Sequence, residues 1–166
     1  DALAGIDGAA LLLELPKRGA QAVAGQVGTR AGHQTWVTQD GITVSFRNGA
    51  LSTTRGLGND LMAADLDEVV SALKGHREQA LRLHQYLDGE DQTVTRAFIC
   101  DYTTHGTQTL QTLFHGTRAR HITETCVSTD LQFENQYWFG PRGILRKSRQ
   151  WVGPENGPLL VERIKD

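Results

Sequence analysis

The sequence lacks the features that mark several large classes of protein. No stretch of its 166 residues approaches the ~18 consecutive apolar residues that a membrane-spanning helix needs. The longest apolar run near the start, residues 9–13, is not preceded by a charged segment, so it is not an intact signal peptide. The formal net charge of −2 provides no basic surface for nucleic acid, and no nucleic-acid partner is expected.

The motifs of several common enzyme classes are also missing. The chain has no GxSxG nucleophile motif, no phosphate-binding loop, no GxGxxG and no HExxH. Residues 54–61 contain Gly56 and Gly58 but lack the Lys-Ser/Thr pair of a Walker loop, so these glycines are expected to permit positive φ angles or close packing. Arg55 and Asp60 in this segment are expected to pair with each other. The sequence predicts no cofactor.

Methionine and cysteine are scarce. The single methionine is Met62, and the absence of one at position 1 fits either a removed leader or a trimmed chain. Cys100 and Cys126 lack CxxC spacing, which argues against a thioredoxin motif or a zinc ribbon. Two alternatives remain for them: a disulfide contributing about 3.5 kcal/mol, or two buried thiols that pack as small apolar groups.

What the chain does contain is alternation and turn residues. It has 18 glycines, 39% hydrophobic residues and 22% charged residues, which indicates a folded, turn-rich domain. Asp40-Gly41 and Asn48-Gly49 separate β-rich runs and predict hairpins. Together with the lack of βαβ units, this predicts one antiparallel all-β domain over residues 1–166. The expected strands are 11–15, 20–29, 35–38, 42–46, 50–54, 81–87, 93–101, 110–115, 118–126, 133–139, 144–151 and 159–164.

One short helix is predicted between Asp65 and Gly75. Asp65 is placed to cap it, with Glu68 at capping-box spacing. Gly75 after Lys74 is a typical end signal. The apolar positions follow a helical period: Leu66, Val69, Val70 and Leu73.

The expected strands place a condition on the disulfide. If 93–101, 109–115 and 118–126 formed a flat meander, Cys100 and Cys126 would flank a middle strand. Two strand spacings are about 9.6 Å, more than the ~7 Å that a disulfide spans. A bridge therefore requires strong curvature, a diverted middle segment, or direct pairing of the outer strands.

Histidines and carboxylates offer two weak candidate sites. His115 and His121 flank a predicted turn and would need Glu124 or His105 as a third metal ligand. Exposed strand histidines without a metal are the favoured interpretation of all six: His33, His76, His84, His105, His115 and His121. Two facing carboxylates ~5 to 9.5 Å apart would suit a glycosidase. Glu124 and Glu134 are the candidates, although their spacing does not require it.

Five aromatic residues stand out in a chain with little aromatic content. Two interpretations stay open: a sugar-stacking platform beside Asn135, Gln136, Arg149 and Gln150, or ordinary core packing. On a strand, Tyr137 and Phe139 face one way and Trp138 the other, so one core cannot hold all three. The aromatic residues concerned are Trp36, Tyr137, Trp138, Phe139 and Trp151.

Several motifs together resemble one family. They are Trp36, Asp40-Gly41, Asn48-Gly49-Ala50-Leu51, residues 54–61, Glu124, Asn135-Gln136-Tyr137-Trp138, Gly143, and Ser148-Arg149-Gln150-Trp151. This set, spread over residues 11–164, is similar to that of the YjbF/GfcB lipoproteins, which are associated with group 4 capsule and exopolysaccharide operons of Gram-negative bacteria.

The resemblance implies a barrel-like β domain, or strongly curved sheets, with one or two short helices. It also implies a location on the periplasmic side of the outer membrane, tethered through an acylated N-terminal cysteine. The sequence shows neither a lipobox nor that cysteine, so we expect that leader and anchor have been left out; a soluble variant is the alternative. The oxidising periplasm favours the Cys100–Cys126 disulfide.

The leading functional hypothesis is a non-enzymatic accessory lipoprotein for capsule or exopolysaccharide assembly or export. Its partner would be a glycan chain or a protein of the export machinery. The candidate ligand-binding residues are Arg55, Asn59, Asp60, Glu124, Asn135, Trp138 and Arg149. In the structural alternative, these side chains form a buried network that holds the Gly-rich segment against the Asn-x-Tyr-Trp strand. Two other functions are weighed: a carrier of lipid or acyl chains with the helix as a lid, and a glycan-modifying enzyme.

Overall fold

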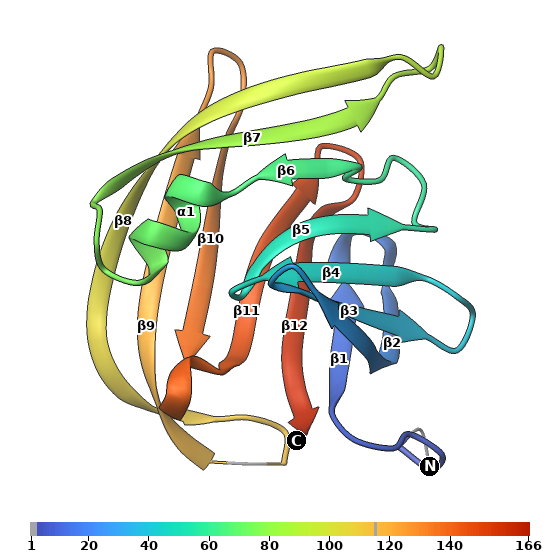
Figure 1. Cartoon of the computed structure of the whole chain (residues 1–166), viewed down its shortest axis with the longest axis vertical. Coiled ribbons are helices and arrows are strands. Elements are labelled where there is room, and N and C mark those ends of the chain that lie inside the picture. Colours follow the sequence, from blue (N-terminus) through green and yellow to red (C-terminus); the bar gives the residue numbers. More distant parts are fainter. Residues whose placement is uncertain (1–2, 115) are drawn as a thin grey trace.

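The computed structural model describes residues 3–114 and 116–166 as a single twelve-stranded antiparallel sheet (Figure 1). The sheet curves into a nearly closed barrel, which confirms the predicted all-β, barrel-like fold. One α-helix and two 3-10 turns, η1 (Pro16–Arg18) and η2 (Pro141–Gly143), accompany it. The strands are β1 (Ala10–Leu15), β2 (Ala20–Arg30), β3 (His33–Thr38), β4 (Thr43–Arg47), β5 (Ala50–Arg55), β6 (Ala63–Asp65), β7 (Gln79–Leu87), β8 (Thr93–Gln111), β9 (Gly116–Val127), β10 (Gln132–Phe139), β11 (Leu145–Gly153) and β12 (Gly157–Lys165).

The strand order explains how the barrel closes. The order is β5-β4-β3-β2-β1-β12-β11-β10-β9-β8-β7-β6, two meanders joined where β1 pairs with β12. The two edge strands, β5 and β6, meet at a seam. There the Thr54 N–H donates to the Leu61 carbonyl (2.9 Å). The start of β1 and the end of β12 lie at the same end of the molecule (Figure 1).

The longest strand, β8, shows that the separate strand predicted at 110–115 is wrong, and it explains how Cys100 and Cys126 form a disulfide. β8 has 19 residues and includes both 93–101 and the start of the segment expected as a separate strand at 110–115. An irregularity between Thr104 and Thr107 bends it, and Gly106 there has φ +77°. Cys100 and Cys126 are therefore direct partners on β8 and β9. Their Cα atoms are 4.0 Å apart and they form the expected disulfide, by direct strand pairing.

The helix α1 (Asp67–Leu73) is where expected, but its start differs. Leu66, rather than Asp65, is the N-cap residue and makes no side-chain capping bond, but the Asp65 carboxylate does accept from the Asp67 N–H at the start of the helix (3.3 Å). The Glu68 carboxylate turns away and accepts from the Leu81 N–H (3.4 Å), so the predicted capping box is wrong. Gly75 does end the helix, with φ +86° and its N–H on the Ala72 carbonyl (2.9 Å). In the described ranges, no helix has the length and apolar character to cross a membrane.

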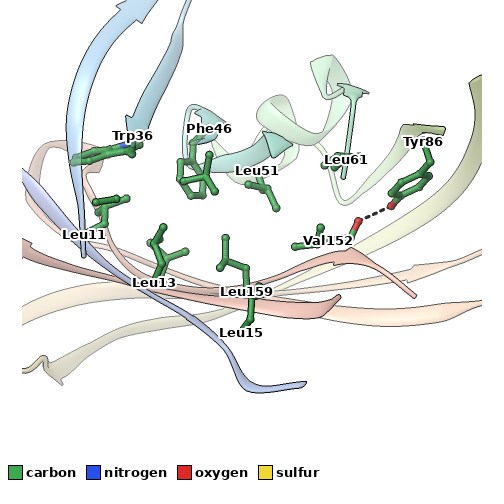
Figure 2. Close-up of a cluster of buried hydrophobic side chains, with 13 residues drawn as sticks. Leu11, Leu13, Leu15, Trp36, Phe46, Leu51, Leu61, Tyr86, Val152 and Leu159 are labelled. Atoms are coloured by element: carbon green, nitrogen blue, oxygen red, sulfur yellow. Dashed lines mark hydrogen bonds between the residues drawn. The ribbon is translucent and has the colours of Figure 1, made fainter. Parts of the chain in front are cut away.

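The barrel interior contains two main apolar clusters. The first runs from Leu11 and Trp36 at one end to Tyr86 and Val152 at the other, where the Tyr86 hydroxyl donates to the Val152 carbonyl (2.6 Å, Figure 2). The second lies under α1, whose apolar side chains pack against Ala50, Ile122, Tyr137 and Phe139. The predicted apolar face of the helix, Leu66, Val69, Val70 and Leu73, is buried in this cluster. The helix thus packs onto the sheet instead of covering an open space.

Candidate functional site

The seven predicted ligand-binding residues occupy three separate places. The first place is the seam between β5 and β6, where Arg55 ends β5 and Asn59 and Asp60 lie in the loop that leads to β6. Glu124 and Asn135 point into the barrel and are fully buried. The remaining pair, Trp138 and Arg149, lies on the outer face of β10 and β11. Only Glu124 and Asn135 are in direct contact, so the set does not form one site.

In the seam, Arg55 and Asp60 serve the backbone. The Arg55 guanidinium donates to the carbonyls of Thr54 (2.7 Å), Leu61 (3.1 Å) and Met62 (2.8 Å). The Asp60 carboxylate accepts from the Thr54 hydroxyl (2.7 Å) and from the backbone N–H groups of residues 56 and 57 (3.1 and 3.2 Å). The expected Arg55–Asp60 pair is therefore wrong. Together these bonds close the barrel at its open edge.

The loop that follows β5 is held from the other side by Asn156. The Asn156 side chain is buried and donates to the carbonyls of Gly58 (2.9 Å) and Asn59 (3.1 Å). Arg18 donates to the Leu57 carbonyl. Asn59 itself adopts φ +50°, a conformation that asparagine tolerates better than most residues. The Gly-rich segment is thus part of the barrel's closure.

Glu124 is the centre of a buried polar network. Its carboxylate accepts from Arg82 Nη2 (2.9 Å), the Tyr137 hydroxyl (2.7 Å) and Asn135 Nδ2 (2.8 Å). The Tyr102 hydroxyl also donates to it. Arg82 and Glu124 expose 1% and 0% of their side chains. A buried ion pair survives only when hydrogen bonds satisfy its remaining atoms, and this one has such bonds on every side.

The electrostatics of the network fix its protonation. Burial is the largest influence on Arg82 and opposes its charged form, but the combined effects of Glu124, Tyr137 and Tyr102 exceed it and raise the guanidinium pKa. Burial, and then the positive charge of Arg82, hold the pKa of His84 well below its usual value. Burial raises the pKa of Tyr137, and the negative charge of Glu124 adds to the effect. In this network the Arg82 cation therefore lies beside a neutral His84 imidazole and a neutral Tyr137 hydroxyl.

The neutral imidazole has a defined tautomer. Arg82 Nη1 lies 3.2 Å from His84 Nε2, and because arginine only donates, Nε2 must accept. Nδ1 then carries the hydrogen and donates to the Tyr86 hydroxyl at 3.0 Å. Tyr86 passes the chain on to the Val152 carbonyl. This series of bonds ties β7 to β11 across the interior.

Two buried amides complete the cross-links. The Asn135 carbonyl oxygen accepts from the Trp151 N–H (2.7 Å), which links β10 to β11. Gln150 accepts from the Leu51 N–H (2.7 Å) and donates to the Gly49 carbonyl (2.8 Å). Gln150, and not Glu124 or Asn135, connects β11 to the β4–β5 turn. Of the seven residues in the structural alternative, only Glu124 and Asn135 belong to the buried network, and among the described residues that network does not hold segment 54–61 against β10, so this alternative is wrong.

On the outer face, Trp138 is flanked on both sides. The ring of His121 on β9 stacks at 4.5 Å and 4°, and Lys147 on β11 lies 5.6 Å from the indole centroid. His105 stacks on the far side of His121 at 4.6 Å. A sugar that stacks on Trp138, as predicted, would have to displace one of these neighbours. Arg149 is exposed on the same face.

The metal and carboxylate hypotheses do not fit this arrangement. Glu124 faces the interior, whereas Glu134 is exposed on the neighbouring strand and lies on the opposite face of the sheet, so the glycosidase-like pair does not form. His121 also faces outward, away from Glu124, and His115 lies outside the described residues. His84 is buried, against the expectation of an exposed histidine. Glu124 lies within 4.8 Å of the Cys100 and Cys126 sulfur atoms, but the disulfide leaves them no thiolate.

Comparison with known proteins identifies the family. The model of the family described as "Group 4 capsule polysaccharide lipoprotein gfcB, YjbF" matches residues 1–164. The chain belongs to the YjbF/GfcB lipoprotein family. This match confirms the resemblance seen in the sequence. The description of the family as lipoproteins implies a membrane-anchored location in the cell envelope.

Individual relatives agree with this family. The chain is 28% identical over 141 residues to the uncharacterized lipoprotein YjbF of Escherichia coli K12, covering 81% of this chain and 65% of that protein. It thus spans less than two thirds of the relative's length. The crystal structure of the hypothetical lipoprotein YmcC from Escherichia coli superposes with a TM-score of 0.82 at 20% identity, over 97% of this chain and 85% of YmcC. The YmcC comparison shows that the two proteins share the fold.

Proposed function

We propose that this YjbF/GfcB domain is a non-catalytic accessory protein of capsule or exopolysaccharide assembly or export, and that it binds the polysaccharide. It would act on the periplasmic side of the outer membrane, where the lipid anchor of such a lipoprotein would hold it. The observation that carries the proposal is the family match over residues 1–164, whose description names a capsule polysaccharide lipoprotein.

The barrel itself supports binding over catalysis. The buried ionisable groups, Arg82 and Glu124, are hydrogen-bonded to protein side chains inside the sheet. The carboxylate pair that an enzyme of this class requires is divided between the two faces of the sheet. The lipid-carrier alternative gains no support, because the side chains assigned to a lid are packed in the second apolar cluster.

The test is a titration of the folded, oxidised chain with oligosaccharides prepared from the surface polysaccharide of its own host. Saturable chemical-shift changes in the ¹H–¹⁵N spectrum support the proposal. No saturable change at millimolar ligand removes glycan binding. A protein of the export machinery is then the remaining candidate partner, and site-specific cross-linking in cells would identify it.

A further inference from the structure

One end of the barrel contains a cleft of about 360 Å³, a volume within the range of small-ligand sites. It lies next to the end of the first apolar cluster that contains Leu11 and Trp36 (Figure 2). Its walls come from the β4–β5 turn, the η2 turn and the ends of β1, β3 and β12. Arg142 and Arg163 line it, and no acidic residue is among its lining residues. In a chain with net charge −2, this is a local concentration of positive charge.

The two arginines keep hydrogen-bond donors for a ligand. Arg163 lies over the Trp36 ring (5.6 Å) and uses Nε to bond Asp166 (2.9 Å). Asp166 is shared with Arg146 (2.7 Å), so one carboxylate faces two guanidinium groups. Neither terminal nitrogen of Arg163 has a protein partner within residues 3–114 and 116–166, and in the same ranges the exposed Arg142 has no partner at all. A guanidinium with free terminal nitrogens binds carboxylate or phosphate in a two-point geometry.

The turns that form the walls are held in uncommon conformations. Asn48 has φ +49° and Arg142 has φ +62°, both in the left-handed region that few non-glycine residues adopt. Gly49 follows with φ +90°, and a side chain there would meet the Phe139 ring at 2.8 Å. The Gln150 amide holds the Gly49 carbonyl in place.

We infer that this cleft is the glycan site of the protein and that it binds an anionic sugar unit, one that bears a carboxylate or a phosphate. Arg142 and Arg163 bind the charge, and the apolar floor contacts the C–H face of the ring. The cleft's volume suits one or two sugar units rather than a long acyl chain. This inference rests on the proposed glycan-binding function and deepens it.

The experiment uses three small probes that differ in charge: glucuronic acid, glucose 1-phosphate and glucose. They are titrated into the ¹⁵N-labelled chain at low salt. We expect the two anionic probes to bind at least about tenfold more tightly than glucose, with shifts at Asn48, Gly49 and residues 142–145. Comparing the two anions shows whether a carboxylate or a phosphate is preferred.

The decisive variant is Arg142→Gln, because Arg142 is exposed and makes no internal bond that folding requires. We expect it to weaken anion binding about tenfold and to leave the rest of the spectrum unchanged. Arg96→Gln removes an arginine of β8 that does not line the cleft and serves as the matched control; it should bind as the wild type does.

Three results would overturn the inference: equal affinity for glucose and the anions, shifts outside the cleft, or loss of binding in the Arg96 variant but not in the Arg142 variant. If host oligosaccharides bind while Arg142→Gln has no effect, the proposed function stands and the assigned site is wrong. If neither host oligosaccharides nor the probes bind, both are wrong.

Discussion

Glu124→Gln tests the buried network at its centre. The substitution removes the negative charge and places an NH₂ group among four donors: Arg82, Tyr102, Tyr137 and Asn135. Arg82 cannot lose its proton, so it stays charged inside the barrel. Breaking a buried pair from one side costs about 3–5 kcal/mol. Because a domain of this size has only about 5–15 kcal/mol in total, the variant should remain folded but be strongly destabilised.

Arg82→Met breaks the same pair from the other side and should cost less. The carboxylate keeps three neutral donors, and it is able to bind a proton, which an isolated guanidinium cannot release. The free energy of unfolding should therefore fall less in Arg82→Met than in Glu124→Gln.

Urea unfolding of the oxidised proteins, followed by tryptophan fluorescence, measures both costs. Arg96→Gln is the control, because the Arg96–Asp130 pair is exposed (37% and 68%) and 3.5 Å long. Its loss should cost less than about 1 kcal/mol. If Glu124→Gln lies within 1 kcal/mol of the wild type at an unchanged m-value, the network does not stabilise the barrel as argued.

Three further predictions follow from individual contacts. The pKa of His84 is held below its unfolded value of about 6.5, so the unfolded state binds more protons than the folded state below that pH. As the pH decreases below about 6.5, the free energy of unfolding should therefore fall by up to about 1.4 kcal/mol per pH unit. The difference in this slope between the wild type and His84→Gln measures the contribution of His84. Replacing both Cys100 and Cys126 with alanine should lower the free energy of unfolding by about 3.5 kcal/mol in urea titrations, and a loss below 1 kcal/mol would contradict the cross-link's role. Arg55→Lys should destabilise the seam by about 1–3 kcal/mol, because an ammonium cannot reach three carbonyls as the planar guanidinium does; unchanged stability with lost glycan binding would make Arg55 a ligand residue instead.

Much of the fold could be predicted because its signals are local. Asp40-Gly41 and Asn48-Gly49 fixed the hairpins of the first half, and Gly49 has the positive φ that such a turn requires. Alternation located most strands to within two residues. Local signals could not select the direct pairing of the Cys100 and Cys126 strands from the three alternatives for the disulfide. β8 continues through a bulge at Gly106, and a bulge has no reliable local signal.

The buried network could not be predicted from hydrophobicity. On β7, Arg82, His84 and Tyr86 point inward, while Leu81 and Leu87 are 38% and 43% exposed. Apolar content alone would assign the two faces the other way. What reverses them is the long-range contact of Arg82 with Glu124, 42 residues away in the chain. The predicted ligand-binding residues do not form one site for a related reason. They were grouped by their closeness in the sequence, but neighbouring side chains on a strand alternate between the inside and the outside of the barrel.

The central claim is that this domain binds polysaccharide, and titration with host oligosaccharides tests it most directly. The account predicts saturable shifts in the ¹H–¹⁵N spectrum that begin at the β4–β5 turn and at η2, with the amides of β7 around Arg82 unchanged. A spectrum that does not change at millimolar oligosaccharide would contradict it.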